Sequence, residues 1–94
     1  ERNAIDQSFR DIATILFVLN SLDTSEPELL LNKLEPLENS LIWKASALEL
    51  RAFIYLKNNQ EKEALNIFQQ IIDMPSKPSS LGLRAKNMVD FLGK

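Results

Sequence analysis

Residues 48–75 contain two short amphipathic segments separated by a tight Asn-Asn turn, and this pattern restricts the fold more than any other feature. The first segment places Ala52 and Tyr55 on one helical face. The second places Ala64 and Phe68 on another. Two helices joined by so short a turn must pack antiparallel. We expect the small alanines to let the two backbones approach closely, while the two aromatic rings fill the space beside them.

The rest of the chain follows the same pattern and predicts an all-α fold of about five helices. Leucine, alanine and glutamate are abundant and glycine occurs only twice, which favours helix. Clusters of proline, serine, asparagine and aspartate mark the boundaries. Pro36 should bend or shorten the second helix, because proline interrupts helical hydrogen bonding. The expected helices span residues 3–22, 26–38, 41–57, 60–74 and 79–92.

Residues at the expected boundaries also predict how the helices begin. Ser25 with Glu28, and Asn58 with Glu61, have the spacing of capping boxes. Ser40 can cap the third helix, because its hydroxyl can accept a free backbone N–H.

The third expected helix is apolar on two sides. One stripe consists of Leu41, Ala45, Leu48, Ala52 and Tyr55. The second consists of Trp43, Ala47, Leu50 and Ile54. A helix with two apolar stripes is expected to lie between two layers of neighbours, as the first helix of an internal repeat does.

The chain matches itself at a spacing of 34 residues. The superposed pairs are Ser25 with Asn59, Leu31 with Leu65, Leu34 with Phe68, Leu37 with Ile71, Ala13 with Ala47, Val18 with Ala52, and Leu19 with Phe53. Such units resemble tetratricopeptide repeats, with Asn59 in place of the usual turn glycine. The resemblance implies one domain over residues 1–94, built as a right-handed solenoid of antiparallel helix-turn-helix repeats. Its parts would be a degenerate first repeat (1–39), a better-formed second repeat (40–75) and a C-terminal capping helix (76–94). An ordinary antiparallel helix bundle is the alternative.

The composition argues against several classes of function. The chain has no cysteine and no histidine, so it lacks thiolate ligands, disulfides and the commonest general base. Two glycines are too few for a glycine-rich phosphate loop. A net charge of −2 gives no general attraction to nucleic acid. We therefore expect a non-catalytic protein-interaction module without cofactor or metal. A small enzyme is the alternative from another class.

The first expected helix is apolar around most of its circumference, so it is either buried on several sides or missing a neighbour. Its main stripe is Ile5, Phe9, Ile12, Ala13, Leu16 and Leu19, widened by Ile15, Phe17, Val18 and Leu22. The repeat register predicts a partner groove lined by Ile12, Ile15, Leu19, Leu22, Ser46, Glu49, Phe53 and Leu56. Such a groove would accept an apolar helix or an extended segment, from a second copy in a homo-oligomer or from a client protein or peptide. Alternatively, residues upstream of Glu1 cover the first helix.

Residues 40–94 carry a second resemblance. It rests on Trp43, Ala47, Glu49, Leu50, Ala64, Phe68, Pro75, Pro78, Leu83, Arg84, Ala85 and Leu92. This pattern resembles the ancillary Sec-translocon subunits of the bacterial inner membrane, which have tetratricopeptide-like domains. The resemblance implies a periplasmic domain and partners among the Sec translocon and periplasmic chaperones. In that setting Arg84 would cap the preceding loop or pair with Asp73.

The start of the chain bears on this resemblance. The sequence begins at Glu1 rather than at a methionine, so we expect it to be a piece of a longer protein. The resemblance implies that a membrane anchor lies upstream of Glu1. A cytoplasmic adaptor or scaffold with an unrelated partner is the alternative.

Overall fold

The computed structural model describes residues 2–93, with side chains described from residue 5 onward. The described residues form five α-helices, one 3-10 helix and no strand, which confirms the expected all-α class. The elements are α1 (Arg2–Ser21), α2 (Pro27–Leu34), η1 (Glu35–Asn39), α3 (Lys44–Lys57), α4 (Glu61–Asp73) and α5 (Ser79–Leu92).

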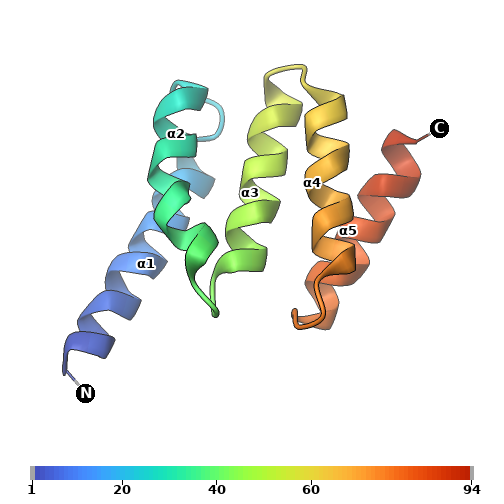
Figure 1. Ribbon diagram of the computed structural model, residues 1–94. Coiled ribbons are helices and arrows are strands. Elements are labelled where there is room, and N and C mark those ends of the chain that lie inside the picture. The colour runs from blue at the N-terminus through green and yellow to red at the C-terminus, as the bar shows by residue number, and fades with distance from the viewer. Residues whose placement is uncertain (1, 94) are drawn as a thin grey trace.

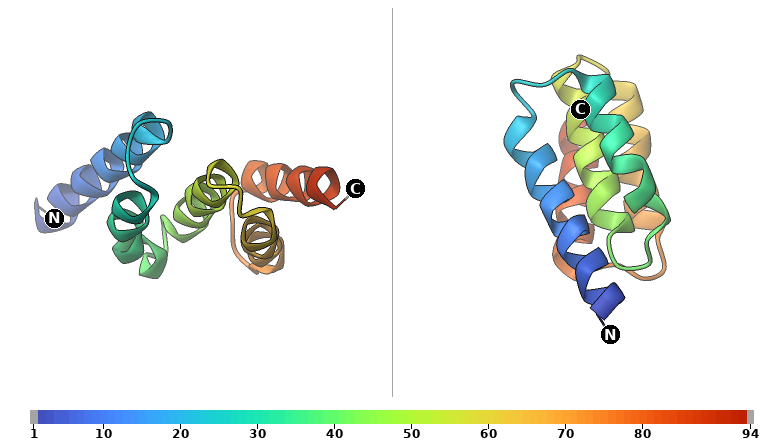
Figure 2. Two further views of the ribbon diagram at one scale, coloured as in Figure 1. Left: turned by 90° about the horizontal axis from the view of Figure 1, so that it is seen from above. Right: turned by 90° about the vertical axis from the view of Figure 1, so that its left-hand side faces the viewer.

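Successive helices run antiparallel and form two rows (Figure 1). Seen from above, α1, α3 and α5 lie in one row and α2 and α4 in the other, so the chain zigzags between them (Figure 2). Each helix packs against the next, and α3 also contacts both α1 and α5. The described residues therefore form a slab with principal extents of 47 × 32 × 17 Å, in which α1 and α5 are the two ends.

Helix α3 lies between two hydrophobic clusters. The N-terminal cluster consists of Val18, Leu30, Leu34, Leu37, Ala47, Leu50 and Ile54. The C-terminal cluster consists of Leu48, Ala52, Ala64, Ile67, Phe68, Ile71 and Ala85. Because α3 supplies residues to both clusters, the predicted two-sided burial of this helix is confirmed.

The α3–α4 hairpin packs as the sequence predicts. Ala52 and Ala64 are both fully buried, so the two backbones come together without large side chains between them. Phe68 is also fully buried, and its ring meets that of Phe53 edge to face with centroids 5.6 Å apart. Tyr55 packs against the same C-terminal cluster.

Helix α2 is shorter than the sequence predicts, and Pro36 explains the difference. The α-helix ends at Leu34, and Glu35–Asn39 continues as a 3-10 helix. Proline has no N–H for an intrahelical bond, and its ring clashes with the carbonyl four residues earlier. The chain tightens there but keeps its direction, so Leu37 is still buried in the N-terminal cluster.

Neither of the two predicted capping boxes forms. The N-cap of α2 is Glu26 rather than Ser25, and the N-cap of α4 is Gln60. Neither of these two side chains makes a capping hydrogen bond. At α2 the first helical residue is Pro27, which has no N–H to be capped. In the α3–α4 turn, the Asn58 side-chain amide donates to Gln60 Oε1 at 2.8 Å instead of capping the helix.

Ser40 caps a turn that precedes α3. Its hydroxyl oxygen accepts the backbone N–H groups of Ile42 at 3.2 Å and Trp43 at 3.1 Å. The α-helix itself begins only at Lys44, three residues later than predicted. As a result Leu41, which the sequence assigns to a buried stripe, lies fully exposed in this turn.

Asn59 ends the α3–α4 turn in the left-handed conformation, with φ of 61°. Its N–H bonds to Leu56 O at 3.1 Å, and the N–H of Gln60 bonds to Tyr55 O at 2.8 Å. These two bonds are those of a Schellman motif, in which the left-handed residue is usually glycine. Asparagine tolerates this conformation better than other side chains do, so Asn59 takes the role of the usual turn glycine.

Replacing Asn59 tests this conformation. We expect Asn59→Val to lower the free energy of unfolding by about 1–2 kcal/mol, because a β-branched residue is strained at positive φ. Asn59→Gly should leave stability unchanged or slightly improved. Urea unfolding followed by circular dichroism measures both variants. Equal stability of the valine variant and the parent would contradict the left-handed assignment.

Two substitutions in α4 test the packing of the hairpin. Phe68→Ala should cost about 3–5 kcal/mol through the cavity that it leaves. Ala64→Leu should cost about 1–3 kcal/mol by overpacking the contact with α3. As a control, the exposed Asn66→Ala should change stability by less than about 0.5 kcal/mol. Thermal unfolding of either core variant at the temperature of the parent would contradict this pairing of α3 and α4.

Candidate protein-interaction surface

Helix α1 exposes a row of large apolar side chains to solvent. We call this row the α1 stripe; its members and their exposed fractions are Ile5 (54%), Phe9 (69%), Ile12 (40%), Leu16 (51%) and Leu19 (52%). They follow one another at alternating spacings of four and three residues, so they share one helical face.

A different face of α1 packs against the rest of the molecule. Val18 is fully buried in the N-terminal cluster, and Ile15 and Leu22 pack against that cluster. Phe17 points elsewhere and is exposed, with Lys33 Nζ 5.4 Å from its ring centroid. The buried face of α1 is therefore narrow, and the residues of the α1 stripe beside it are only partly covered by the rest of the molecule.

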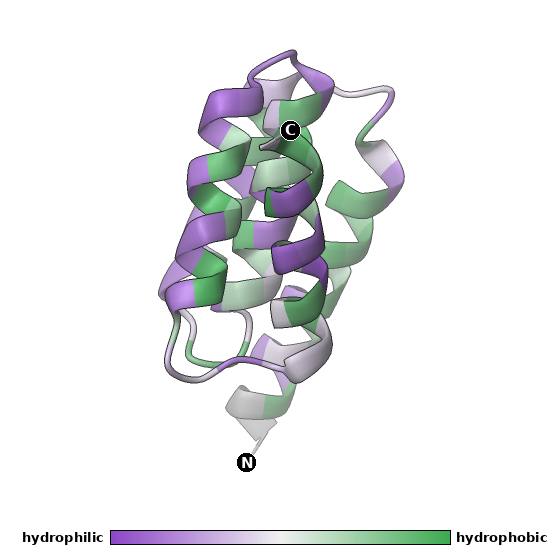
Figure 3. Ribbon diagram, turned by 90° about the vertical axis from the view of Figure 1, so that its right-hand side faces the viewer, coloured by the Kyte–Doolittle hydropathy of each residue, from purple (hydrophilic) through white to green (hydrophobic). Residues whose placement is uncertain are grey.

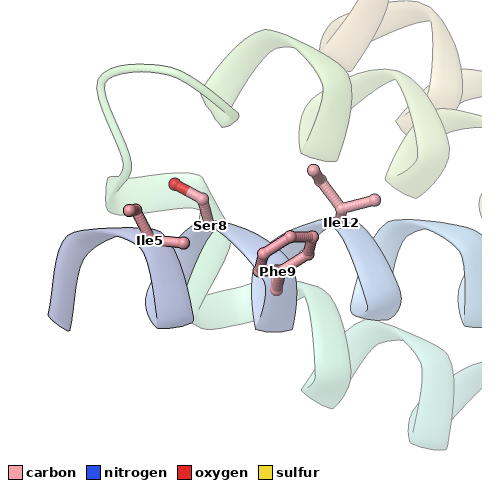
Figure 4. Close-up of a pocket in the computed structure, with 4 residues that line it drawn as sticks. All are labelled: Ile5, Ser8, Phe9 and Ile12. Atoms are coloured by element: carbon pink, nitrogen blue, oxygen red, sulfur yellow. The ribbon is translucent and has the colours of Figure 1, made fainter. Parts of the chain in front are cut away.

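The N-terminal half of the stripe borders a shallow hollow of about 280 Å³. Ile5, Ser8, Phe9 and Ile12 line it, all from α1 (Figure 4). The lining is apolar apart from the Ser8 hydroxyl. A hollow walled by one helix is open along its length, so it suits the side chains of a docked helix better than a small ligand that must be enclosed.

The four α1 residues of the predicted groove divide between two environments. Ile12 and Leu19 belong to the exposed α1 stripe. Ile15 and Leu22 are half-buried and pack against the N-terminal cluster.

The four α3 residues of the predicted groove lie nearer to α5. Phe53 and Leu56 pack against the C-terminal cluster, and Ser46 is half-buried. Glu49 is held by an ion pair with Arg84 of α5. The α3 side of the predicted groove is thus partly covered by the chain itself, and the exposed apolar surface is concentrated on α1.

Arg84 and Glu49 form a two-pronged ion pair that joins α5 to α3. Arg84 Nε lies 2.8 Å from Glu49 Oε2, and Arg84 Nη2 lies 3.0 Å from Oε1. These hydrogen bonds, together with the charge of the carboxylate, raise the pKa of Arg84. The predicted roles of Arg84, pairing with Asp73 or capping the preceding loop, are wrong. Lys77 Nζ caps that loop instead, by donating to the Met74 carbonyl at 2.8 Å.

Two further ion pairs of the described residues involve α3. Arg51 donates to Glu38 at 2.8 Å and to the Tyr55 hydroxyl at 3.1 and 3.2 Å. The hydrogen bond with Tyr55, more than the nearby carboxylate, raises the pKa of Arg51 against the effect of burial. Lys57 pairs with Asp23 of the α1–α2 turn. These ion pairs join α3 to neighbouring parts of the slab. None of them includes a residue of the α1 stripe.

The described part of the chain contains neither a metal-binding cluster nor a membrane-spanning helix. No group of three or more metal-ligating side chains in residues 2–93 is placed to hold a metal ion. None of the helices described there combines the length and apolar content that crossing a membrane requires.

The groove predicted from the sequence does not include three members of the α1 stripe, Ile5, Phe9 and Leu16. The signal that identifies them is the alternating four-and-three spacing, which continues through Ile12 and Leu19. The groove prediction relied on the repeat register, which gives the residues that correspond to the inner face of a tetratricopeptide repeat. On α1 two of those residues, Ile15 and Leu22, pack against the N-terminal cluster.

Comparison of the chain with models of known protein families, with curated proteins and with solved structures gave no match.

Leu19 and Phe53 were both assigned to the predicted groove, and their environments predict different effects on stability. Leu19→Ser should change the free energy of unfolding by less than about 0.5 kcal/mol, because the side chain is exposed. Phe53→Ser should cost about 1–3 kcal/mol, because it removes the contact with Phe68. Urea unfolding compares the two. An equal loss of stability in both variants would contradict the division between surface and core.

Proposed function

We propose that this protein is a non-catalytic protein-interaction module whose contact surface is the α1 stripe. The observation that carries the proposal is the exposure of five large apolar side chains along one helical face. At about 150–200 Å² for a large apolar side chain, the stripe leaves on the order of 500 Å² of apolar surface in water. An apolar patch of that size is as large as the largest patch on a typical monomer, and such patches are often functional.

The burial pattern supports a repeat-type scaffold beneath this surface. Four pairs of core residues that superpose at the 34-residue spacing are buried in both halves of the chain, whereas Ala13 and Leu19 are exposed and their counterparts Ala47 and Phe53 are not. The matching buried pairs are Val18 with Ala52, Leu30 with Ala64, Leu34 with Phe68, and Leu37 with Ile71. The halves differ where Pro36 stands in place of Gln70, since α2 is broken there and α4 is continuous. We therefore propose two degenerate tetratricopeptide-like hairpins closed by α5, a scaffold type that typically binds proteins.

The resemblance to ancillary Sec-translocon subunits supplies a proposed setting. In it, the domain acts on the periplasmic side of the bacterial inner membrane, with the Sec translocon or a periplasmic chaperone. The residues that carry the resemblance have structural roles in this domain. Trp43 and Ala47 pack in the N-terminal cluster, Phe68 in the C-terminal cluster, and Glu49 binds Arg84. They support a shared scaffold more than a shared partner, so a cytoplasmic adaptor with the same fold is the second candidate.

Photo-crosslinking in cells of the source organism tests the proposed surface. A benzophenone amino acid is placed at Phe9 or Leu16 in the full-length protein, and at Lys62 on the exposed face of α4 as a control. We expect ultraviolet light to produce protein adducts from the two stripe positions and few from Lys62. Adduct yields at Phe9 and Leu16 no higher than at Lys62 would contradict the proposed function.

A further inference from the structure

We infer that the α1 stripe docks against the α1 stripe of a second copy of this chain. The inference rests on the proposed function and names the partner of the same surface. Its basis is the spacing, the flanking chemistry and the area of the stripe, together with the character of the opposite end of the molecule.

The spacing of the stripe selects a helix as the partner. Residues 5, 9, 12, 16 and 19 alternate at steps of four and three, which gives the period of 3.5 residues found along the seam of a coiled coil. Side chains at this period enter the spaces between side chains of a facing helix that has the same period. A docked β-strand, with its period of two, would not match it.

The positions that flank the stripe favour a partner whose own flanking positions carry little charge. Ser8 and Ile15 border the stripe on one side, and Asp6, Ala13 and Asn20 border it on the other. Asp6 is the only charged residue among these flanking positions. Coiled-coil partners of a different kind are usually selected by opposite charges at the flanking positions. Here opposite charges at the flanking positions are nearly absent, whereas a second α1 supplies an apolar seam whose flanking residues, apart from Asp6, are uncharged.

The opposite end of the slab offers no comparable face. Leu83 and Phe91 are the large exposed apolar residues of α5, and they lie eight residues apart, about 12 Å along the helix. In the view onto α5, hydrophilic residues interrupt the hydrophobic ones along the helix (Figure 3). Head-to-tail stacking would press the α1 stripe against this mixed surface. A face-to-face pair instead joins two identical stripes and closes on itself, as two-fold dimers do.

The area of the stripe places a contact between two copies in the size class of weak, transient interfaces. About 500 Å² from each copy gives a buried area on the order of 1,000 Å², at the lower limit for a specific interface. We therefore expect a reversible dimer with a dissociation constant in the micromolar range, so that monomer and dimer exchange with protein concentration.

Sedimentation velocity across a concentration series tests the dimer with a matched pair of variants. Phe9 and Phe91 are equally exposed, at 69%, but only Phe9 belongs to the stripe. We expect the parent and Phe91→Ser to shift from monomer to dimer together, and Phe9→Ser to raise the dissociation constant at least about tenfold. Circular dichroism checks that both variants keep their helices. A parent that stays monomeric throughout, or equal losses in the two variants, would overturn the inference.

Charge substitutions at Ile12 test the face-to-face geometry. Ile12 is the middle residue of the stripe, so it faces the Ile12 of its partner when the two helices run parallel and lies within about one helical turn of it when they run antiparallel about the middle of the stripe. Ile12→Glu and Ile12→Lys should each be monomeric, because two like charges would meet in an apolar seam. An equimolar mixture of the two should dimerise. A mixture that associates no more tightly than either variant alone, or a single variant that dimerises as tightly as the parent, would overturn this geometry.

The self-docking inference and the proposed function can fail separately. If the parent stays monomeric and benzophenone at Phe9 still captures a different protein at a defined site, the self-docking inference fails and the proposed function stands. If the parent stays monomeric and Phe9 yields no adduct above the Lys62 control, both fail.

Discussion

The burial of α3 on two faces is the interaction on which the rest of the structure depends. Ala47 and Ile54 face the N-terminal cluster, while Leu48 and Ala52 face the C-terminal cluster. Because the two clusters share this helix as their common wall, the α1–α2 hairpin and the α4–α5 hairpin are held in one slab through it. The ion pairs of α3 help to orient the neighbouring elements against this helix. They are largely surface contacts, so they contribute much less free energy than apolar burial does.

This arrangement leaves the two end helices in different situations. Helix α5 turns Leu81 and Ala85 into the slab and presents a mostly polar outer side. Helix α1 buries Val18 and keeps its longest apolar row in water. Exposed apolar area of this extent costs solvation free energy that docking of another helix would recover. The fold thus links a structural fact, an uncovered end helix, to a proposed function in protein association.

The sequence predicts the helices and the α3–α4 hairpin because both depend on local periodicity and turn chemistry, as at Asn59. The sequence predicts less well which partner a side chain takes at a helix end or in a contact between helices. Ser25 forms no capping box at α2, whose first helical residue, Pro27, has no N–H to be capped. Asn58 forms none at α4, because its amide bonds to the Gln60 side chain. Arg84 pairs with Glu49 because α5 packs on α3, a contact between elements that helical periodicity does not predict. For α1, periodicity identifies an apolar face but not what covers it, so the groove prediction mixed surface residues with core residues such as Ile15.

Hydrogen–deuterium exchange of backbone amides at several protein concentrations tests the account most directly, because it compares α3 and α1 in one experiment. Amides of α3 should be strongly protected at every concentration, because the helix is enclosed by both clusters. Amides of α1 should exchange faster in dilute protein and become protected as concentration rises, as the stripe docks. Protection of α1 that does not change with concentration, or exchange of α3 as fast as that of α1, would contradict the account.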